Sequence, residues 1–524
     1  MKLSCARVST FAGGIANSGT IVVKSIAGIE VFGDLTFGGG IINSGTIVAK
    51  SVAGIHVFNV LTFGGGIINS GAISTAGRGI LVGGATFLAP GVSSFSGDVV
   101  NTGKISAKTG ISISKSTIAG AIVDSGTIRA TKDDILVSGG VVSGGIQVGS
   151  HGTISAGSSA IVVTNTTTFA GGITNSGTIS AGHSHDGIFV SNTSIFSGGI
   201  RNAASGRIAA GASGIEVKLV TTFAGGISNA GTISASDFSR VGIYLSKDAV
   251  FGSSSAGGGI TNTGTISSGA GAGIDLFNVT TVFGSIVNKG KIIAGHGGID
   301  VSTVTVFGSG SAGGGITNSG TISAGHDGIY VNAATFLGGI TNSGTISTAF
   351  TGIFLKTVTT FLGGITNSGT IISKTSAHGV DNASLFSGDI RNSSSGRIVA
   401  GSSGIEIKLV TTFTGGIINA GTITSTGRVG IFVDNASLFS GDISNSSSGR
   451  IAAGSTGIEV KLVTTFAGAS VTRARFPRAL TAFSSKTLRS SPATSSIAAP
   501  AELRPAPPAS RSSWSLPSRA TSAT

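Results

Sequence analysis

The sequence predicts an all-β fold, a single-stranded right-handed parallel β-helix (β-solenoid) of about 17 coils. Three observations predict it. A motif of about 27 residues repeats along most of the chain, its apolar and small polar residues alternate with a period of two, and no segment offers ten or more residues at helical periodicity. Each coil would bury its apolar side chains only against its neighbours, as in other one-dimensional arrays.

The repeat has the consensus T-F-x-G-G-I-x-N-S-G-T-I-x-A-G, a variable stretch, and then G-I-x-V. We expect three short strands per unit, around F-x-G-G-I, G-T-I-x-A and G-I-x-V, with turns at Gly, Asn and Ser between them. At a strand spacing of about 4.8 Å, the rod would be roughly 80 Å long. The leading apolar residues mark 17 complete units and the start of another: Phe11, Phe37, Phe63, Phe95, Ile118, Val142, Phe169, Phe196, Phe223, Phe251, Phe283, Phe307, Phe336, Phe361, Phe386, Phe413, Phe439 and Phe466.

Alternation within a unit predicts which side chains face inward. In the unit that begins at Phe169, the inward set is Phe169, Ile173, Ile179, Ile188 and Val190. Because each strand would pair with its equivalent in the next coil, Phe would stack on Phe and Ile on Ile. The interior would consist of dry columns parallel to the rod.

The Asn of N-S-G predicts a structural ladder in which each amide bonds the equivalent amide one coil away. Its turn would be left-handed, with positive φ at Gly177 and the equivalent glycines. Two units carry Asp124 and Val148 instead of Asn. A polar binding strip is the alternative interpretation of the column, which contains Asn17, Asn43, Asn69, Asn101, Asn175, Asn202, Asn229, Asn262, Asn288, Asn318, Asn342, Asn367, Asn392, Asn419 and Asn445.

Composition divides the chain into a short N-terminal stub (1–10), the repeat array (11–468) and a Ser/Ala/Pro/Arg-rich tail (469–524). The tail holds seven of the eight prolines and a net charge of +7, with eight basic residues and one acid. We expect it to be disordered or derived from a frameshift. Residues 1–468 hold 25 basic and 19 acidic residues, so they lack the basic stripe that nucleic-acid binding requires.

No catalytic, cofactor-binding or metal-binding residue is predicted. The Gly-Gly pairs precede no helix, which excludes a phosphate loop. Five histidines are expected in one variable turn, where the alternative is a metal or acid–base patch: His183, His185, His296, His326 and His378. The acids Asp133, Asp134, Asp275, Asp300, Glu216, Glu406 and Glu459 are scattered, whereas a polysaccharide-cleaving β-helix needs carboxylates that converge on one groove.

Tandem G-G-I-x-N-S-G-T-I-x-A with G-I-x-V resembles the passenger region of bacterial autotransporters (type V secretion). The resemblance covers roughly residues 10–468. It implies export through the outer membrane and a cell-surface or secreted rod that often mediates adhesion or aggregation, and it brings no catalytic residues. The chain as given shows neither a secretory signal nor the strands of an outer-membrane anchor, so we expect no membrane insertion by this chain.

These observations favour a non-catalytic structural or adhesive rod without a cofactor. Its partners would be host or abiotic surfaces, glycans or other copies of the rod. The alternatives are a polysaccharide-active β-helix enzyme, an ice- or surface-binding solenoid, and a truncated fragment without function. A longer similarity also links residues 194–236, 384–423 and 437–468, which share F-S-G-[GD]-I-x-N and G-I-E-[VI]-K-L-V-T-T-F and indicate internal duplication.

Overall fold

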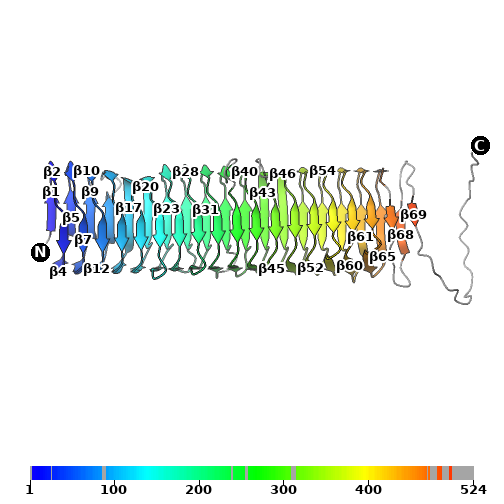
Figure 1. Cartoon of the computed structure of the whole chain (residues 1–524), viewed down its shortest axis with the longest axis horizontal. Coiled ribbons are helices and arrows are strands. Elements are labelled where there is room, and N and C mark those ends of the chain that lie inside the picture. Colours follow the sequence, from blue (N-terminus) through cyan, green and yellow to red (C-terminus); the bar gives the residue numbers. More distant parts are fainter. Residues whose placement is uncertain are drawn as a thin grey trace, which may run out of the picture.

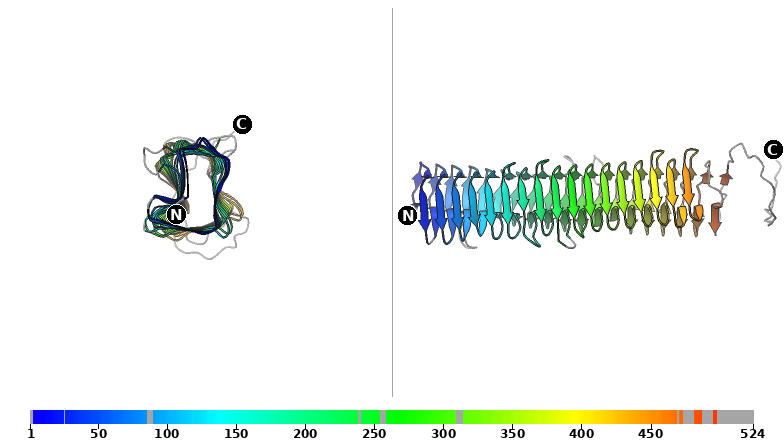
Figure 2. Two further views of the ribbon diagram at one scale, coloured as in Figure 1. Left: turned by 90° about the vertical axis from the view of Figure 1, so that its left-hand side faces the viewer. Right: turned by 90° about the horizontal axis from the view of Figure 1, so that it is seen from below.

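The computed structural model is a parallel β-solenoid, as predicted, with no helix in the residues it describes (Figure 1). The strands lie across the long axis of the rod and follow one another from the N-terminal end in sequence order (Figure 1). Seen along the axis, the coils superimpose in an elongated, roughly rectangular outline (Figure 2). The described residues are 3–24, 26–84, 90–237, 240–253, 258–308, 314–468, 470–472, 481–486 and 495–497.

One coil contains four strands rather than the three predicted. The segment around F-x-G-G-I is two strands, because its two glycines bend the chain between β24 and β25. In this coil the strands are β24 (Thr168–Phe169), β25 (Ile173–Asn175), β26 (Thr178–Ser180) and β27 (Ile188–Ser191).

Equivalent strands of successive coils pair in parallel and form continuous ladders. The T-I-x-A ladder runs from β4 (Thr20–Val23) to β64 (Arg450–Ala453) and contains 17 strands, which agrees with the predicted number of coils. The T-F and G-I-x-V strands share a second ladder. They merge into one long strand in four coils, at β17 (Thr109–Ile118), β20 (Ile135–Val142), β43 (Ile299–Phe307) and β46 (Ile329–Phe336).

The I-x-N ladder begins at β3 (Ile15–Asn17), reaches β63 (Ile443–Asn445) and continues into the region predicted as a tail. Of that region, 469–524, the structure describes the backbone of three strands, which pair with preceding coils. The remainder of the predicted tail lies outside the described residues. The three strands are β67 (Ser470–Thr472), β68 (Thr481–Lys486) and β69 (Ser495–Ile497).

The interior is filled by the predicted columns. Phe169, Ile173, Ile179, Ile188 and Val190 are all fully buried. Phenyl rings of successive coils stack face to face at 4.7–5.4 Å between centroids in most pairs. One marker was wrong: Val282, not Phe283, pairs with Phe251 and Phe307, and Phe283 points outward. The spacing explains this, because in coils without an insertion at the bend the column residue lies four positions before the first residue of the I-x-N strand, which is Ile286 in this coil.

The asparagines form two buried ladders. Each Nδ2 donates to Oδ1 of the asparagine in the next coil at 2.6–2.9 Å and, in nearly every coil, also to a nearby backbone carbonyl. The first ladder runs from Asn17 to Asn101 and ends on Asp124, whose Oδ1 accepts from Asn101 at 2.7 Å. Val148 interrupts the column, and a second ladder runs from Asn175 to Asn445.

The predicted left-handed turn at N-S-G was wrong. Neither Asn175 nor Gly177 has a positive φ. Glycine is needed at position 177 because an added Cβ would overlap the carbonyl oxygens of Gly149 and Gly152 in the preceding coil. The left-handed residue of the coil follows G-I-x-V instead, for example Asn192 (φ 47°) and Leu219 (φ 56°).

The expectation for His378 was also wrong, since it lies in the core rather than in a turn. It pairs with Ile353 and Ile405 of the adjacent coils and therefore occupies an Ile position. The side chain is fully buried, and neither ring nitrogen has a hydrogen-bond partner among the described residues. Burial alone lowers the pKa of His378 to about 4. The imidazole is therefore neutral in the folded rod.

We predict that His378→Ile stabilises the rod, and more so in acid. The pKa of His378 is lower in the folded chain than in the unfolded chain, so the unfolded state takes up the proton first and the rod loses stability as pH falls from 6.5 towards 4. At pH 5 this loss amounts to about 2 kcal/mol. Urea unfolding at pH 7.5 and pH 5 measures it. The exposed His151→Ser is the control, and an equal pH dependence in His378→Ile and wild type would contradict the prediction.

We also predict that Asp124→Asn combined with Val148→Asn joins the two ladders. Asp124 is buried, its Oδ2 has no hydrogen-bond partner among the described residues, and burial raises its pKa to about 6. The folded pKa lies above the unfolded value of 3.8, so the unfolded chain loses its proton first and the rod loses stability as pH rises from 3.8 towards 6, by about 3 kcal/mol in total at pH 8. The amide introduced by Val148→Asn would donate to Oδ1 of Asn175, which now accepts only from Gly177 N–H at 3.1 Å.

The free energy of unfolding, measured at pH 8 and pH 4, tests the ladder repair. The double variant is expected to exceed wild type by about 1–3 kcal/mol at pH 8 and by less at pH 4. Asn229→Ala, in the middle of the second ladder, serves as the opposite control because it leaves neighbouring amides unpaired. A double variant no more stable than wild type at pH 8 would refute this account of the ladder.

Candidate functional site

The asparagine column offers nothing to an external ligand. All fifteen predicted asparagines are buried, with exposures of 7% at Asn17 and 0–1% at the others. Their amides are used between coils, so the polar strip lies inside the rod. Any site for a ligand must therefore be built from outward-facing residues and turns.

The structure separates the five histidines into three environments. His183 is exposed and its Nδ1 lies 2.9 Å from Asp237 Oδ1, and His185 is exposed in the same turn. His296 and His326 come from adjacent coils, and their rings stack at 4.7 Å. His378 is the core residue described above. The histidines therefore do not form one patch.

Carboxylates do gather beside the stacked histidines. His296 Nδ1 lies 3.5 Å from Asp300 Oδ2, and His326 Nδ1 lies 3.0 Å from Asp327 Oδ2. Asp275 is the register partner of Asp300 on the preceding strand. Burial, and then the charge of Asp300, raise the pKa of Asp275 to about 7. Its hydrogen bond to Asp300 raises the pKa of His296, so proton-donating and proton-accepting groups lie side by side.

These acids lie on the outer face of the G-I-x-V strands, where the side chains are largely shielded from solvent. In register along this face lie Glu216, Tyr244, Asp275, Asp300 and Tyr330. Asp300 is 8% exposed and the others are half-buried. The two tyrosines thus flank an acidic pair. Sequence reasoning missed them, although aligning the third position of G-I-x-V across units would have placed all five in one column.

Two of the other predicted acids, Asp134 and Glu406, have structural partners. Asp134 is fully buried and accepts the N–H of Ala130 at 2.9 Å, and burial raises its pKa to about 9. Glu406 pairs with Lys408 and accepts from the Ser376 hydroxyl. The Glu-x-Lys position was predicted to face outward as a charged strand position. Glu216, Glu406 and Glu459 do lie on the outer face, but all three are half-buried.

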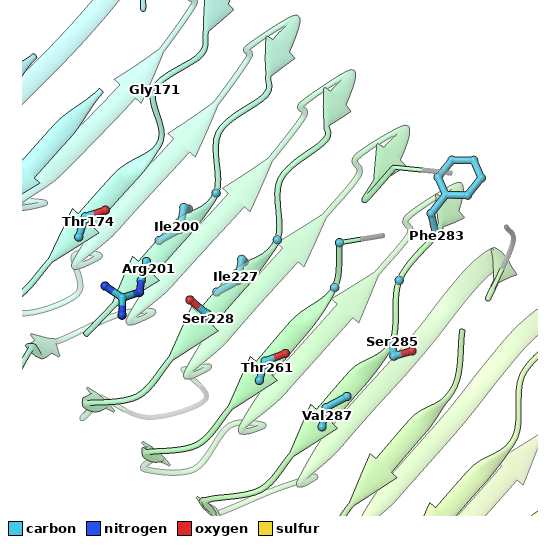
Figure 3. A pocket seen from close by; sticks show the side chains of 15 residues that line it. Gly171, Thr174, Ile200, Arg201, Ile227, Ser228, Thr261, Phe283, Ser285 and Val287 are labelled. Atoms are coloured by element: carbon cyan, nitrogen blue, oxygen red, sulfur yellow. The ribbon is translucent and has the colours of Figure 1, made fainter. Parts of the chain in front are cut away.

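A groove with a volume of about 610 Å³ lies elsewhere, over the Gly-Gly bends of five successive coils (Figure 3). It extends from Gly171 to Val287 along the rod. Glycine backbone forms much of its floor, because a side chain at the first glycine of a bend would overlap the preceding coil. For instance, a Cβ at Gly198 or Gly225 would overlap backbone atoms of the preceding coil.

The side chains of the groove are few. Four carry hydroxyls, at Thr174, Ser228, Thr261 and Ser285, and Ile200, Ile227, Phe283 and Val287 are apolar (Figure 3). Arg201 is the only charged residue among the described residues that line it. Arg201 is exposed and stands between Thr174 and Ser228 in the register of the I-x-N ladder. The groove contains no carboxylate among the described residues that line it. Its chemistry is that of a shallow, positively charged trough with hydroxyl groups on one wall.

Searches for relatives give no further assignment. No family model, no curated protein and no solved structure matches the chain. Among the described residues, no three His, Cys, Asp or Glu side chains are arranged to hold a metal ion. Those residues also include no helix long and apolar enough to cross a membrane.

Proposed function

We propose that the chain is a stiff, non-catalytic rod that serves as the passenger of a surface-displayed or secreted protein and makes many weak contacts along its length. The observation that carries this proposal is the unbroken register of the T-I-x-A ladder through 17 coils. A rod of this kind places equivalent surface positions at regular intervals. The autotransporter resemblance of the repeat supports the same role.

Stiffness follows from the way neighbouring coils are joined. Every coil is bonded to the next through strand ladders, a column of apolar side chains and, in most coils, an asparagine amide. Bending the rod would stretch these contacts on one side and compress them on the other. Compression is resisted because the interior is close-packed and the bend glycines leave no space between coils.

The repeated outward-facing side chains can supply many equivalent contacts along the rod. On the outer face of the I-x-N ladder, Thr317, Thr341 and Thr366 lie in register on successive strands. On the T-I-x-A ladder, Thr321, Thr345 and Thr370 do the same. Each contact that such a hydroxyl makes is weak, but contacts made by one rigid rod to one surface add their free energies. Avidity would therefore grow with the number of coils.

Removal of residues 307–412 tests this proposal, because it deletes four whole coils and joins equivalent positions. The full chain and the shortened chain are anchored at equal density on beads. We expect the shortened chain to show at least tenfold weaker attachment to glycan-coated and bare surfaces, or at least tenfold weaker bead aggregation. Circular dichroism and thermal melting check that the shortened rod is folded. Equal attachment and equal aggregation by both rods would contradict the adhesive role and leave only a spacer.

A second candidate, a polysaccharide-active enzyme, is favoured by the acidic pair between two tyrosines. Glycoside hydrolysis uses one protonated and one ionised carboxyl group. With its pKa near 7, Asp275 stands protonated beside Asp300 in part of the population at neutral pH.

For a non-catalytic rod, we expect no release of reducing ends when the chain is incubated with neutral or acidic polysaccharides between pH 5 and 8. Release by wild type that is lost in both Asp275→Asn and Asp300→Asn would favour the enzyme instead. His151→Ser, far from the pair, is the control variant for that measurement.

A further inference from the structure

The duplicated segments differ at one position of the groove. The first block (194–236) reads F-S-G-G-I-R-N and the second block (384–423) reads F-S-G-D-I-R-N. Gly199 of the first block therefore corresponds to Asp389 of the second, and Arg201 corresponds to Arg391. Arginine occurs at this position of the I-x-N strands only in these two blocks among the described coils.

In the second block the Asp389 carboxylate is held by two donors. Its Oδ1 accepts the backbone N–H of Gly416 in the next coil at 2.8 Å. Its Oδ2 accepts from Arg391 Nη2 at 3.3 Å. The N–H of the bend recurs as a carboxylate donor elsewhere, since Asp98 Oδ1 accepts from Ala121 N at 2.7 Å. A bend of this rod, with an adjacent arginine, is thus a binding position for a carboxylate.

In the first block both donors are present and the carboxylate is missing. Gly226, which corresponds to Gly416, has no acceptor for its N–H among the described residues, and Arg201 has no acidic partner there. Gly199 contributes no side chain. The groove of about 610 Å³ opens at this place, with Arg201 on its wall (Figure 3).

We propose that this groove binds a carboxylate of an extended acidic polysaccharide, held by the Arg201 guanidinium and the Gly226 N–H in the way that Asp389 is held in the second block. A charge-assisted pair with arginine is the strong part of such a contact. The site is a specific one and goes beyond the rod proposed above, since repeated weak contacts do not require it.

The rest of the groove selects a sugar chain over an acidic peptide. The groove follows the rod across five coils, so its occupant is extended. Hydroxyls of Thr174, Ser228 and Thr261 suit a polyhydroxylated chain, since a hydroxyl both donates and accepts. A peptide that binds as an added strand needs a free sheet edge, whereas the strands here pair with neighbours on both sides.

Isothermal titration of the full chain with a hexamer of galacturonic acid tests the proposal. We expect one site per chain, binding that weakens with added salt, and no binding of the fully methyl-esterified hexamer. Arg201→Ser should weaken binding at least tenfold. Gly199→Asp should abolish it, because the introduced carboxylate would occupy the same donors, and Asp is accommodated at the equivalent positions 389 and 442.

The second block supplies the matched controls. Arg391→Ser should leave binding unchanged, because Arg391 already pairs with Asp389. Asp389→Gly should free both donors and raise the stoichiometry from one site to two. Thermal melting shows whether each variant is folded.

The proposal is overturned if wild type does not bind the hexamer, or if Arg201→Ser and Gly199→Asp bind it like wild type. Hexaglutamate binding as tightly as the sugar would overturn the polysaccharide assignment. Because these titrations use the free chain and one defined ligand, their failure is distinct from failure of the bead assays.

Discussion

The structure depends on one constraint, which is that each coil must repeat the position of the coil beneath it at the spacing of paired strands. The buried asparagine enforces this constraint most strictly. An amide has one carbonyl and one NH₂ group, and in this column the carbonyl faces one neighbour and the NH₂ group the other. A shift of one residue would place the amide outside and an outward residue in its place. The hydrogen bond therefore selects register as well as stabilising it.

The same spacing explains the abundance of glycine. At the bends and corners, backbone from adjacent coils approaches so closely that a Cβ would overlap it, as at Gly177 and Gly198. These glycines are required because no side chain fits between adjacent coils at these positions. Backbone conformation is a separate requirement, met by Asn192 and its equivalents after G-I-x-V. Leu219 occupies that position with a positive φ although leucine gains nothing there, which shows that the ladders override a local cost of about 1 kcal/mol.

Sequence periodicity was sufficient for the features that repeat within a coil. Ile173 and Ile179 could be placed inward from alternation, and the ladder from the recurrence of Asn. It was insufficient where one unit departs from the pattern. His378 looks like a turn residue until it is aligned with Ile353 and Ile405, and Phe283 looks like a column residue until its distance to Ile286 is counted. The groove could not be predicted from the pattern of one unit, because it depends on a contact between coils. A side chain at position 199 would accept from the N–H of a residue in the next coil.

A repetitive chain acquires a specific site most easily on its outer surface. Inside the rod a change is costly, since a departure such as Asp124 leaves a buried oxygen unpaired. On the outer surface, each bend has a backbone N–H that can donate a hydrogen bond. A carboxylate at the bend of the preceding coil can accept it, as Asp389 accepts from Gly416. Glycine at the same position is compatible with the fold, because most coils have glycine at this position of the bend. It leaves the backbone N–H of the next coil and the neighbouring arginine without a carboxylate partner. A duplicated block thus needs only one residue difference to turn an intramolecular contact into an open one, which makes differences between copies more informative about function than the consensus they share.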